Sequence, residues 1–227
     1  MQPKATGISP ISEYEIHSPS RLARKLYLYP LYSGYYKYGP GYFITRTSYD
    51  SFLLMYLTKG ACEIETDGQH FEAEAGQLVL LDCYRPHRYG SRDSWEASWL
   101  HFDGPTARAY DQEITARHGR ILTPSSAVLG LLDEIRSSLR PPCTAGEAVL
   151  SAQLIRLLDL LLAGEEAEEK GPEKNAVADS IAYINEHFRE PVSLELLAAK
   201  AGISPFHFLR VFSQATGLTP HQYLLST

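Results

Sequence analysis

The stretch "GISPFHFLRVFSQATG", residues 202 to 217, holds the clearest structural pattern in the chain. Gly202 and Gly217 each predict the end of a helix, because glycine readily adopts the left-handed conformation that closes one. Ser204 is the predicted N-cap of the later helix, with Pro205 at its first position. The "GIS" connection has the length that joins the two helices of a helix-turn-helix.

The two faces of this helix follow from the spacing of its residues. One stripe, predicted to pack on the preceding helices, is Phe208, Val211, Phe212 and Ala215. The opposite face holds Phe206, Leu209, Arg210 and Ser213. Apolar side chains there suit contacts with thymine methyl groups, and an arginine suits guanine. We therefore predict that this face, with the cap Ser204, binds DNA; the alternative is that Phe206 and Leu209 pack under another part of the protein.

Two more helices precede it. Ser193 is the predicted N-cap of "LELLAAKA", and a further helix runs from residue 175 to Pro191 with apolar residues at helical spacing. The acidic segment "GEEAEEKGPEK", residues 164 to 174, reads as a linker between domains. Since it carries much of the net charge of −6, the charge of the chain does not exclude a DNA partner.

The N-terminal half has a different pattern. From Leu22 to about Leu122 the chain consists of short runs rich in aromatic and β-branched residues, with no helical periodicity. Asp67-Gly68 stands between two alternating runs, which is a strong signal for a tight β-hairpin. Many short strands with glycine-containing turns predict a β-sandwich or a barrel.

Two amphipathic helices are predicted between residues 123 and 163. The first carries Val128, Leu132, Ile135 and Leu139 at helical spacing, and the second carries Leu150, Leu154, Leu157 and Leu161. The second has a wider apolar surface than one stripe. Two interpretations stay open: these four leucines form a dimer seam, or they pack on the barrel.

Several classes of protein are not indicated. No stretch has the length of a membrane helix and no signal peptide is evident, so a cytoplasmic protein is expected. Cys62, Cys83 and Cys143 are widely spaced and read as buried thiols. Barrel histidines His70, His87 and His101 do not form a metal-binding pattern, and no nucleotide-binding or hydrolase motif occurs. We expect neither an enzyme nor a metal or other cofactor.

The segment "VSLELLAAKAGISPFHFLRVFSQATGLTPHQYL" resembles the first helix-turn-helix of AraC/XylS-type transcription regulators. That resemblance places the base-facing positions on Phe206, Leu209 and Arg210. Regulators of this family carry two helix-turn-helix units joined by a long helix, and only the first is present in this sequence.

Residues 42 to 102 resemble the effector domain of the same family, a cupin-type β-barrel whose mouth can hold a ligand. In the sugar-responsive member that names the family, an arginine, a tyrosine and a tryptophan surround the sugar. The resemblance places these on Arg46, Tyr89 and Trp99, with Trp95 and His87 as secondary candidates. The position of a further histidine of that member is Ala97 here, which argues against an identical ligand.

The sequence therefore predicts an α+β protein in four segments: a cupin-like barrel with an N-terminal arm (1–122), a helical dimerisation segment (123–163), an acidic linker (164–174) and a truncated DNA-binding domain (175–227). The arm, residues 1 to about 20, is a candidate lid over the barrel. The predicted function is a homodimeric, ligand-responsive bacterial regulator that senses a small polar molecule, with carbohydrate favoured, and binds double-stranded DNA. The alternative is a truncated sensing and dimerising module without stable DNA binding.

Overall fold

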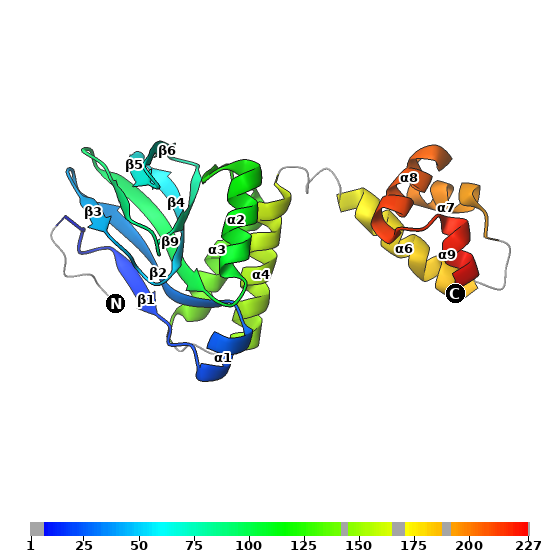
Figure 1. Cartoon of the computed structure of the whole chain (residues 1–227), viewed down its shortest axis with the longest axis horizontal. Coiled ribbons are helices and arrows are strands. Elements are labelled where there is room, and N and C mark those ends of the chain that lie inside the picture. The colour runs from blue at the N-terminus through cyan, green and yellow to red at the C-terminus, as the bar shows by residue number, and fades with distance from the viewer. Residues whose placement is uncertain (1–6, 142–144, 165–170, 188–191, 227) are drawn as a thin grey trace. The chain divides into compact units, whose positions relative to one another are not determined.

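A computed structural model describes residues 7–141, 145–164, 171–187 and 192–226. The chain forms two compact units, residues 1–164 and 165–227 (Figure 1). Strands of the first unit are β1 (Glu13–Ile16), β2 (Tyr29–Tyr38), β3 (Phe43–Arg46), β4 (Phe52–Lys59), β5 (Ala61–Thr66), β6 (Gln69–Glu74), β7 (Leu78–Asp82), β8 (His87–Gly90), β9 (Trp95–Asp103) and β10 (Ile121–Leu122). Its helices are α1 (Arg21–Leu26), α2 (Ala107–His118), α3 (Ser126–Leu139) and α4 (Glu147–Ala163).

The strands form two antiparallel sheets, as the pattern of short runs predicts. One has six strands in the order β1-β2-β9-β4-β7-β10, and the other has four in the order β3-β8-β5-β6. The predicted hairpin joins β5 to β6, where Thr66 pairs with Gln69. Asp67 and Gly68 between them both have positive φ, 53° and 73°, as a tight turn of this kind requires.

The six-stranded sheet is covered on both faces, so its central strands are buried along almost their whole length. Alternate residues of β4 and β9, such as Leu53 and Trp99, face the space between the sheets. Their neighbours Leu54 and Leu100 pack against the helices on the other face. This double burial explains why "FLLMYLT" and "LVLLD" are apolar along most of their length and do not alternate.

Residues 22 to 122 are predicted as strands because they show no helical periodicity, but α2 and most of α1 lie there. Helix α2 buries only Ala107, Asp111 and Ile114, which is too small an apolar face to give a clear periodic signal. Ion pairs hold its charged positions to the barrel: Arg108 Nη1 lies 2.7 Å from Asp82 Oδ2, and Asp111 Oδ1 lies 3.3 Å from Arg120 Nη1.

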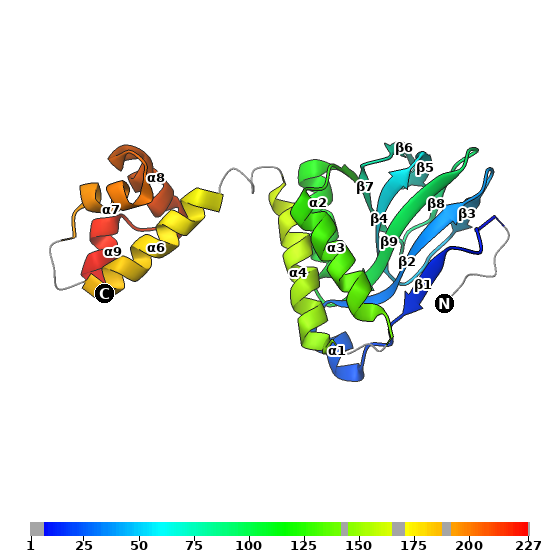
Figure 2. The ribbon, with the colours of Figure 1, turned by 180° about the vertical axis from the view of Figure 1, so that it is seen from behind.

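Helices α2, α3 and α4 lie together on one side of the six-stranded sheet, as both views show (Figures 1 and 2). The helical pair α3–α4 is therefore part of the first unit and not a separate segment. The leucines offered as a dimer seam, Leu150, Leu154, Leu157 and Leu161, are at most 5% exposed and belong to the core between these helices and the sheet. The interpretation of these four leucines as a dimer interface is therefore wrong, because all four side chains pack against the barrel of the same chain.

The second unit contains α6 (Gly171–His187), α7 (Leu194–Ala201), α8 (Pro205–Thr216) and α9 (Pro220–Ser226). The predicted caps are confirmed: the Ser193 hydroxyl accepts from Leu196 N, the Ser204 hydroxyl accepts from His207 N, and Gly202 and Gly217 are left-handed. Helix α6 begins within the predicted acidic linker. Residues 165–170 of that linker lie outside the described residues, as do Cys143 and Pro191, the predicted end of the helix before α7.

Candidate functional site

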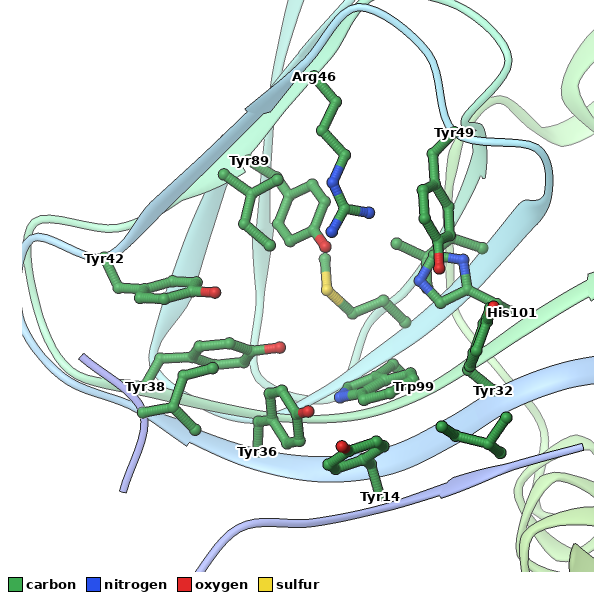
Figure 3. Close-up of a pocket in the computed structure, with 15 residues that line it drawn as sticks. Tyr14, Tyr32, Tyr36, Tyr38, Tyr42, Arg46, Tyr49, Tyr89, Trp99 and His101 are labelled. Carbon is green, nitrogen blue, oxygen red and sulfur yellow. The ribbon is translucent and has the colours of Figure 1, made fainter. Parts of the chain in front are cut away.

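A cavity of about 310 Å³ opens between the two sheets of the first unit (Figure 3). This is a size suited to a small molecule, since ligand pockets measure roughly 300–1,000 Å³. Its walls come from β1, β2, β3, β4, β8 and β9 and from the chain near them. The lining residues are Ile8, Tyr14, Ile16, Tyr32, Tyr36, Tyr38, Tyr42, Ile44, Arg46, Tyr49, Leu53, Met55, Tyr89, Trp99 and His101.

Three of the residues that the sequence nominates for ligand binding, Arg46, Tyr89 and Trp99, meet in this cavity. Arg46 ends β3 and Tyr89 lies on the paired strand β8. Trp99 lies on the central strand β9 of the other sheet. Figure 3 shows the Arg46 guanidinium extending into the cavity, with Tyr89 beside it and Trp99 on the opposite wall. The fold thus gathers residues that are 53 positions apart in sequence.

The two secondary candidates, Trp95 and His87, are not among the lining residues. Trp95 is fully buried and stacks on Tyr38, with 3.9 Å between ring centroids, so it supports the cavity wall from behind. His87 is buried, and its Nδ1 lies 2.8 Å from the Arg85 carbonyl oxygen. Burial lowers the pKa of His87, so its ring is neutral at neutral pH.

Of the aromatic side chains that line the cavity, only Tyr89 and Trp99 are among the site residues predicted from the sequence. Tyr32, Tyr36 and Tyr38 face the cavity from β2, because residues two apart in a strand share a face. The nine tyrosines between residues 27 and 56 are only weak sequence evidence for such a lining, because tyrosine also favours strands in general. His101 is the largest omission: it lies on the same strand face as Trp99, two residues further on.

The N-terminal arm also forms part of the wall. Ile8, Tyr14 and Ile16 line the cavity, and β1 pairs with β2 along its whole length. The outward-facing Glu13 of β1 forms ion pairs with Arg136, at 3.8 Å, and with Arg140, both at the end of α3. The arm from residue 7 onward is thus an ordered wall of the cavity, which is consistent with the predicted position of a lid.

Burial keeps the uncharged forms of most titratable groups in the cavity. It raises the pKa of Tyr36 and of Tyr49 to about 12, and it lowers the pKa of His101 to about 3, where the nearby Arg46 acts in the same direction. The His101 Nδ1 lies 2.8 Å from the Ser51 hydroxyl. At neutral pH these side chains therefore offer hydroxyl groups and a neutral imidazole to a ligand.

Within the described ranges, no group of three or more histidine, cysteine or acidic side chains is placed to hold a metal ion. None of the helices searched in those ranges is long and apolar enough to cross a membrane. Cys62 and Cys83 are buried free thiols, and burial raises the pKa of each to about 12.

In the second unit, α8 has one buried and one exposed face. Phe208 and Phe212 are fully buried, whereas Phe206 is 82% exposed and Arg210 is also exposed. Two predicted positions behave differently. Ala215 is exposed although it was expected in the buried stripe, and Leu209 is half-buried because it lines a cleft with residues of α7 and α9. Ser204 is exposed and Ser213 is half-buried.

Comparison with known proteins gives two family matches, which meet inside α6. Residues 30–183 match the AraC-like ligand binding domain, and residues 184–225 match the bacterial regulatory helix-turn-helix proteins of the AraC family. The MmsAB operon regulatory protein of Pseudomonas aeruginosa is 26% identical over 87% of this chain and 66% of its own length. The HTH-type transcriptional activator RhaS of Salmonella schwarzengrund is 31% identical over 46% of this chain and 36% of its own length.

The chain thus spans less than two thirds of either relative. Among solved structures, ToxT of Vibrio cholerae aligns with 88% of this chain and 98% of its own, at 10% identity and a TM-score of 0.37, a likeness too low to carry an argument. The family matches carry the assignment, because the ligand-binding match alone covers more than half of the sequence. The chain therefore belongs to the AraC family of bacterial regulatory helix-turn-helix proteins.

Proposed function

We propose that this chain is a ligand-responsive transcription regulator. The cavity of the first unit binds a small-molecule effector, and α8 of the second unit enters the major groove of promoter DNA, in the bacterial cytoplasm where that DNA lies. The observation that carries the DNA-binding part is the 82% exposure of Phe206 beside the exposed Arg210, on a helix whose opposite face buries Phe208 and Phe212. A large exposed aromatic ring next to a guanidinium suits contact with base edges.

A binding assay on DNA tests this part. Fluorescence anisotropy with the DNA upstream of the gene should give a lower affinity for Arg210→Ala, by about 1–3 kcal/mol for loss of a base contact. Phe206→Ala should weaken binding to the specific site more than binding to a scrambled duplex. Arg117→Ala is the matched control, because it removes one exposed positive charge from α2 in the other unit.

The alternative is a sensing module without stable DNA binding. It would be favoured if the intact chain failed to bind the upstream DNA at low salt, where phosphate contacts are strongest. Equal binding of specific and scrambled duplexes by the wild-type chain and by Arg210→Ala would also contradict base recognition by α8.

Carbohydrate is the effector class that the sequence favours, and several features support it. The Trp99 indole can cover the C–H face of a sugar ring, the tyrosine hydroxyls can donate to and accept from sugar hydroxyls, and Arg46 can donate several hydrogen bonds. A thermal-shift screen with sugars and polyols tests this idea, because a ligand that binds only the folded state raises its melting temperature. Trp99→Ala should remove that rise.

A homodimer also remains part of the proposal, although the four buried leucines do not supply its interface. The large apolar side chains that α4 exposes are Val149, at 54%, and Ile155, at 41%. Both lie outside the buried side of α4, on opposite flanks of the leucine stripe. Sedimentation of the intact chain and of Ile155→Asp tests this interface: a dimer that becomes a monomer in the variant supports it, and an unchanged dimer places the interface elsewhere.

A further inference from the structure

The cavity contains one cationic side chain, Arg46, and no acidic side chain among its lining residues. Within the part of the chain that the structure describes, no ion pair involves Arg46. Its guanidinium lies 4.3 Å from the centre of the Tyr49 ring, so an aromatic face is its packing partner. Arg108 of α2 and Arg120 each contact at least one aspartate, whereas Arg88 of β8, which does not line the cavity, packs over the ring of Phe43.

The remaining titratable groups of the cavity do not balance this charge. The pKa of Tyr36 and that of Tyr49 are raised by burial, and His101 is held neutral by burial and by the positive charge nearby. The cavity therefore carries a net positive charge at neutral pH. Because it is enclosed by aromatic and aliphatic side chains, that charge is less hydrated than on an open surface.

The types of hydrogen-bonding group in the cavity further restrict the chemical class of its ligand. The lining residues include no carboxylate and no side-chain amide, which are strong acceptors for the hydroxyl groups of a neutral sugar. A guanidinium is planar and matches a carboxylate through two parallel hydrogen bonds, so an acid gains both geometry and charge neutralisation. A neutral ligand would leave the charge of Arg46 uncompensated.

We propose that the effector carries a carboxylate that Arg46 binds, on a ring or other apolar body that packs between Trp99 and the tyrosines of the opposite walls. Figure 3 shows the arrangement that this requires, with the guanidinium reaching into the cavity from β3 and the indole lying across from it. The inference rests on the proposed role of the cavity as the effector site and specifies the chemistry of its ligand. The carboxylate belongs either to a sugar acid or to an aromatic or aliphatic acid.

Two matched pairs of probes test the proposal by calorimetry and thermal shift on the full chain. Benzoate and benzamide have the same ring and nearly the same shape, but only benzoate is charged. Glucuronate and glucose differ in the same way on a sugar body. We expect an acid to bind and to raise the melting temperature, and its neutral counterpart to bind at least about tenfold more weakly. Which acid binds distinguishes the two sources of the carboxylate.

Variants of Arg46 test whether this residue causes the preference for an acid. Arg46→Met removes the charge while keeping much of the side-chain length, and it should weaken binding of the acid by about tenfold or more. Arg46→Lys keeps the charge but lacks the planar guanidinium, so its affinity for the acid should lie between those of the wild type and Arg46→Met. Arg88→Met is the control, because Arg88 lies on the neighbouring strand β8 with its guanidinium over Phe43, 3.9 Å from the ring centre, and does not line the cavity.

Three results would overturn the proposal. One is equal affinity for an acid and its neutral counterpart. Another is acid binding that Arg46→Met leaves unchanged. The third is no binding of either acid at tens of millimolar. The proposed regulator function is judged separately: binding of glucose or benzamide independently of Arg46 would keep the cavity as an effector site, and the DNA-binding assay does not depend on any of these probes.

Discussion

Gly34 of β2 lies directly opposite Trp99 of β9, and the indole occupies the space that a side chain at position 34 would need. A Cβ at Gly34 would lie 2.6 Å from Trp99 Cζ2 and 2.6 Å from the Glu13 carbonyl oxygen of β1. The glycine therefore lets the arm, the sheet and the tryptophan wall of the cavity pack closely together.

Gly34→Ala should destabilise the first unit by about 1–3 kcal/mol, because both contacts are closer than packed atoms allow and one is with backbone. Urea denaturation followed by tryptophan fluorescence measures the loss. Gly130→Ala is the control: Gly130 is exposed in the middle of α3 and a Cβ there meets nothing within 4 Å, so a gain of about 0.5–1 kcal/mol is expected. Equal effects of the two changes would refute the steric argument.

The burial of His101 should make stability depend on pH. Its folded-state pKa is about 3 whereas its ordinary value is 6.5, so the unfolded chain takes up a proton between these limits and the folded chain does not. The free energy of unfolding should therefore be highest above about pH 6.5 and fall toward about pH 3. In His101→Asn this fall should be shallower, since other groups titrate alike in both proteins. Parallel curves for the two proteins would contradict the assignment.

Neighbouring residues of α4 should respond differently to truncation. Leu154 is fully buried in the core beneath the six-stranded sheet, so Leu154→Ala should cost about 2–5 kcal/mol of stability. Ile155 is 41% exposed, and Ile155→Ala should change the stability of the monomeric chain by about 0.5 kcal/mol or less. Chemical denaturation at several protein concentrations separates folding from association. A small effect of Leu154→Ala would mean that α4 does not pack on the sheet in this way.

The ion pair between α2 and the barrel should contribute more to folding stability than a surface ion pair on the same helix. Arg108→Ala leaves the buried Asp82 carboxylate with the more distant Arg85, 3.5 Å away, and should cost about 1–3 kcal/mol. Arg117 pairs with Glu113 on the exposed side of α2, so Arg117→Ala should cost about 1 kcal/mol or less. Thermal denaturation of both variants gives the comparison, and the reverse ranking would argue against a structural role for Asp82.

Truncation of two phenylalanines of α8 should have different effects: one should lower folding stability and the other should lower DNA affinity. Phe208→Ala removes a fully buried ring from the core of the second unit and should cost about 3–5 kcal/mol. Phe206→Ala removes a ring that is 82% exposed, so the unfolding transition should hardly change while DNA affinity falls. Circular dichroism melting with the DNA-binding assay measures both. Loss of stability in Phe206→Ala would support the alternative that this ring packs against another part of the protein.

Local chemistry determined much of the second unit from sequence alone. Serine caps, a proline at the first helical position and glycines in the left-handed conformation act within a few residues, so Ser193, Ser204, Gly202 and Gly217 are found where their types predict them. The hairpin at Asp67 and Gly68 is local in the same sense. The resemblance to the family added Arg46, Tyr89 and Trp99, which meet in the cavity.

Only the tertiary structure decided which surfaces cover one another. The spacing of Leu150, Leu154, Leu157 and Leu161 shows an apolar helix face, but it carries no information on whether the sheet of the same chain or a second copy buries that face. Likewise, His101 and Tyr14 become cavity residues only because β9 and β1 both flank β2. Periodicity reports which residues share a face of one element, because it arises from backbone geometry. Pairing between elements distant in sequence depends on the whole packed core, and that pairing creates the cavity around Arg46.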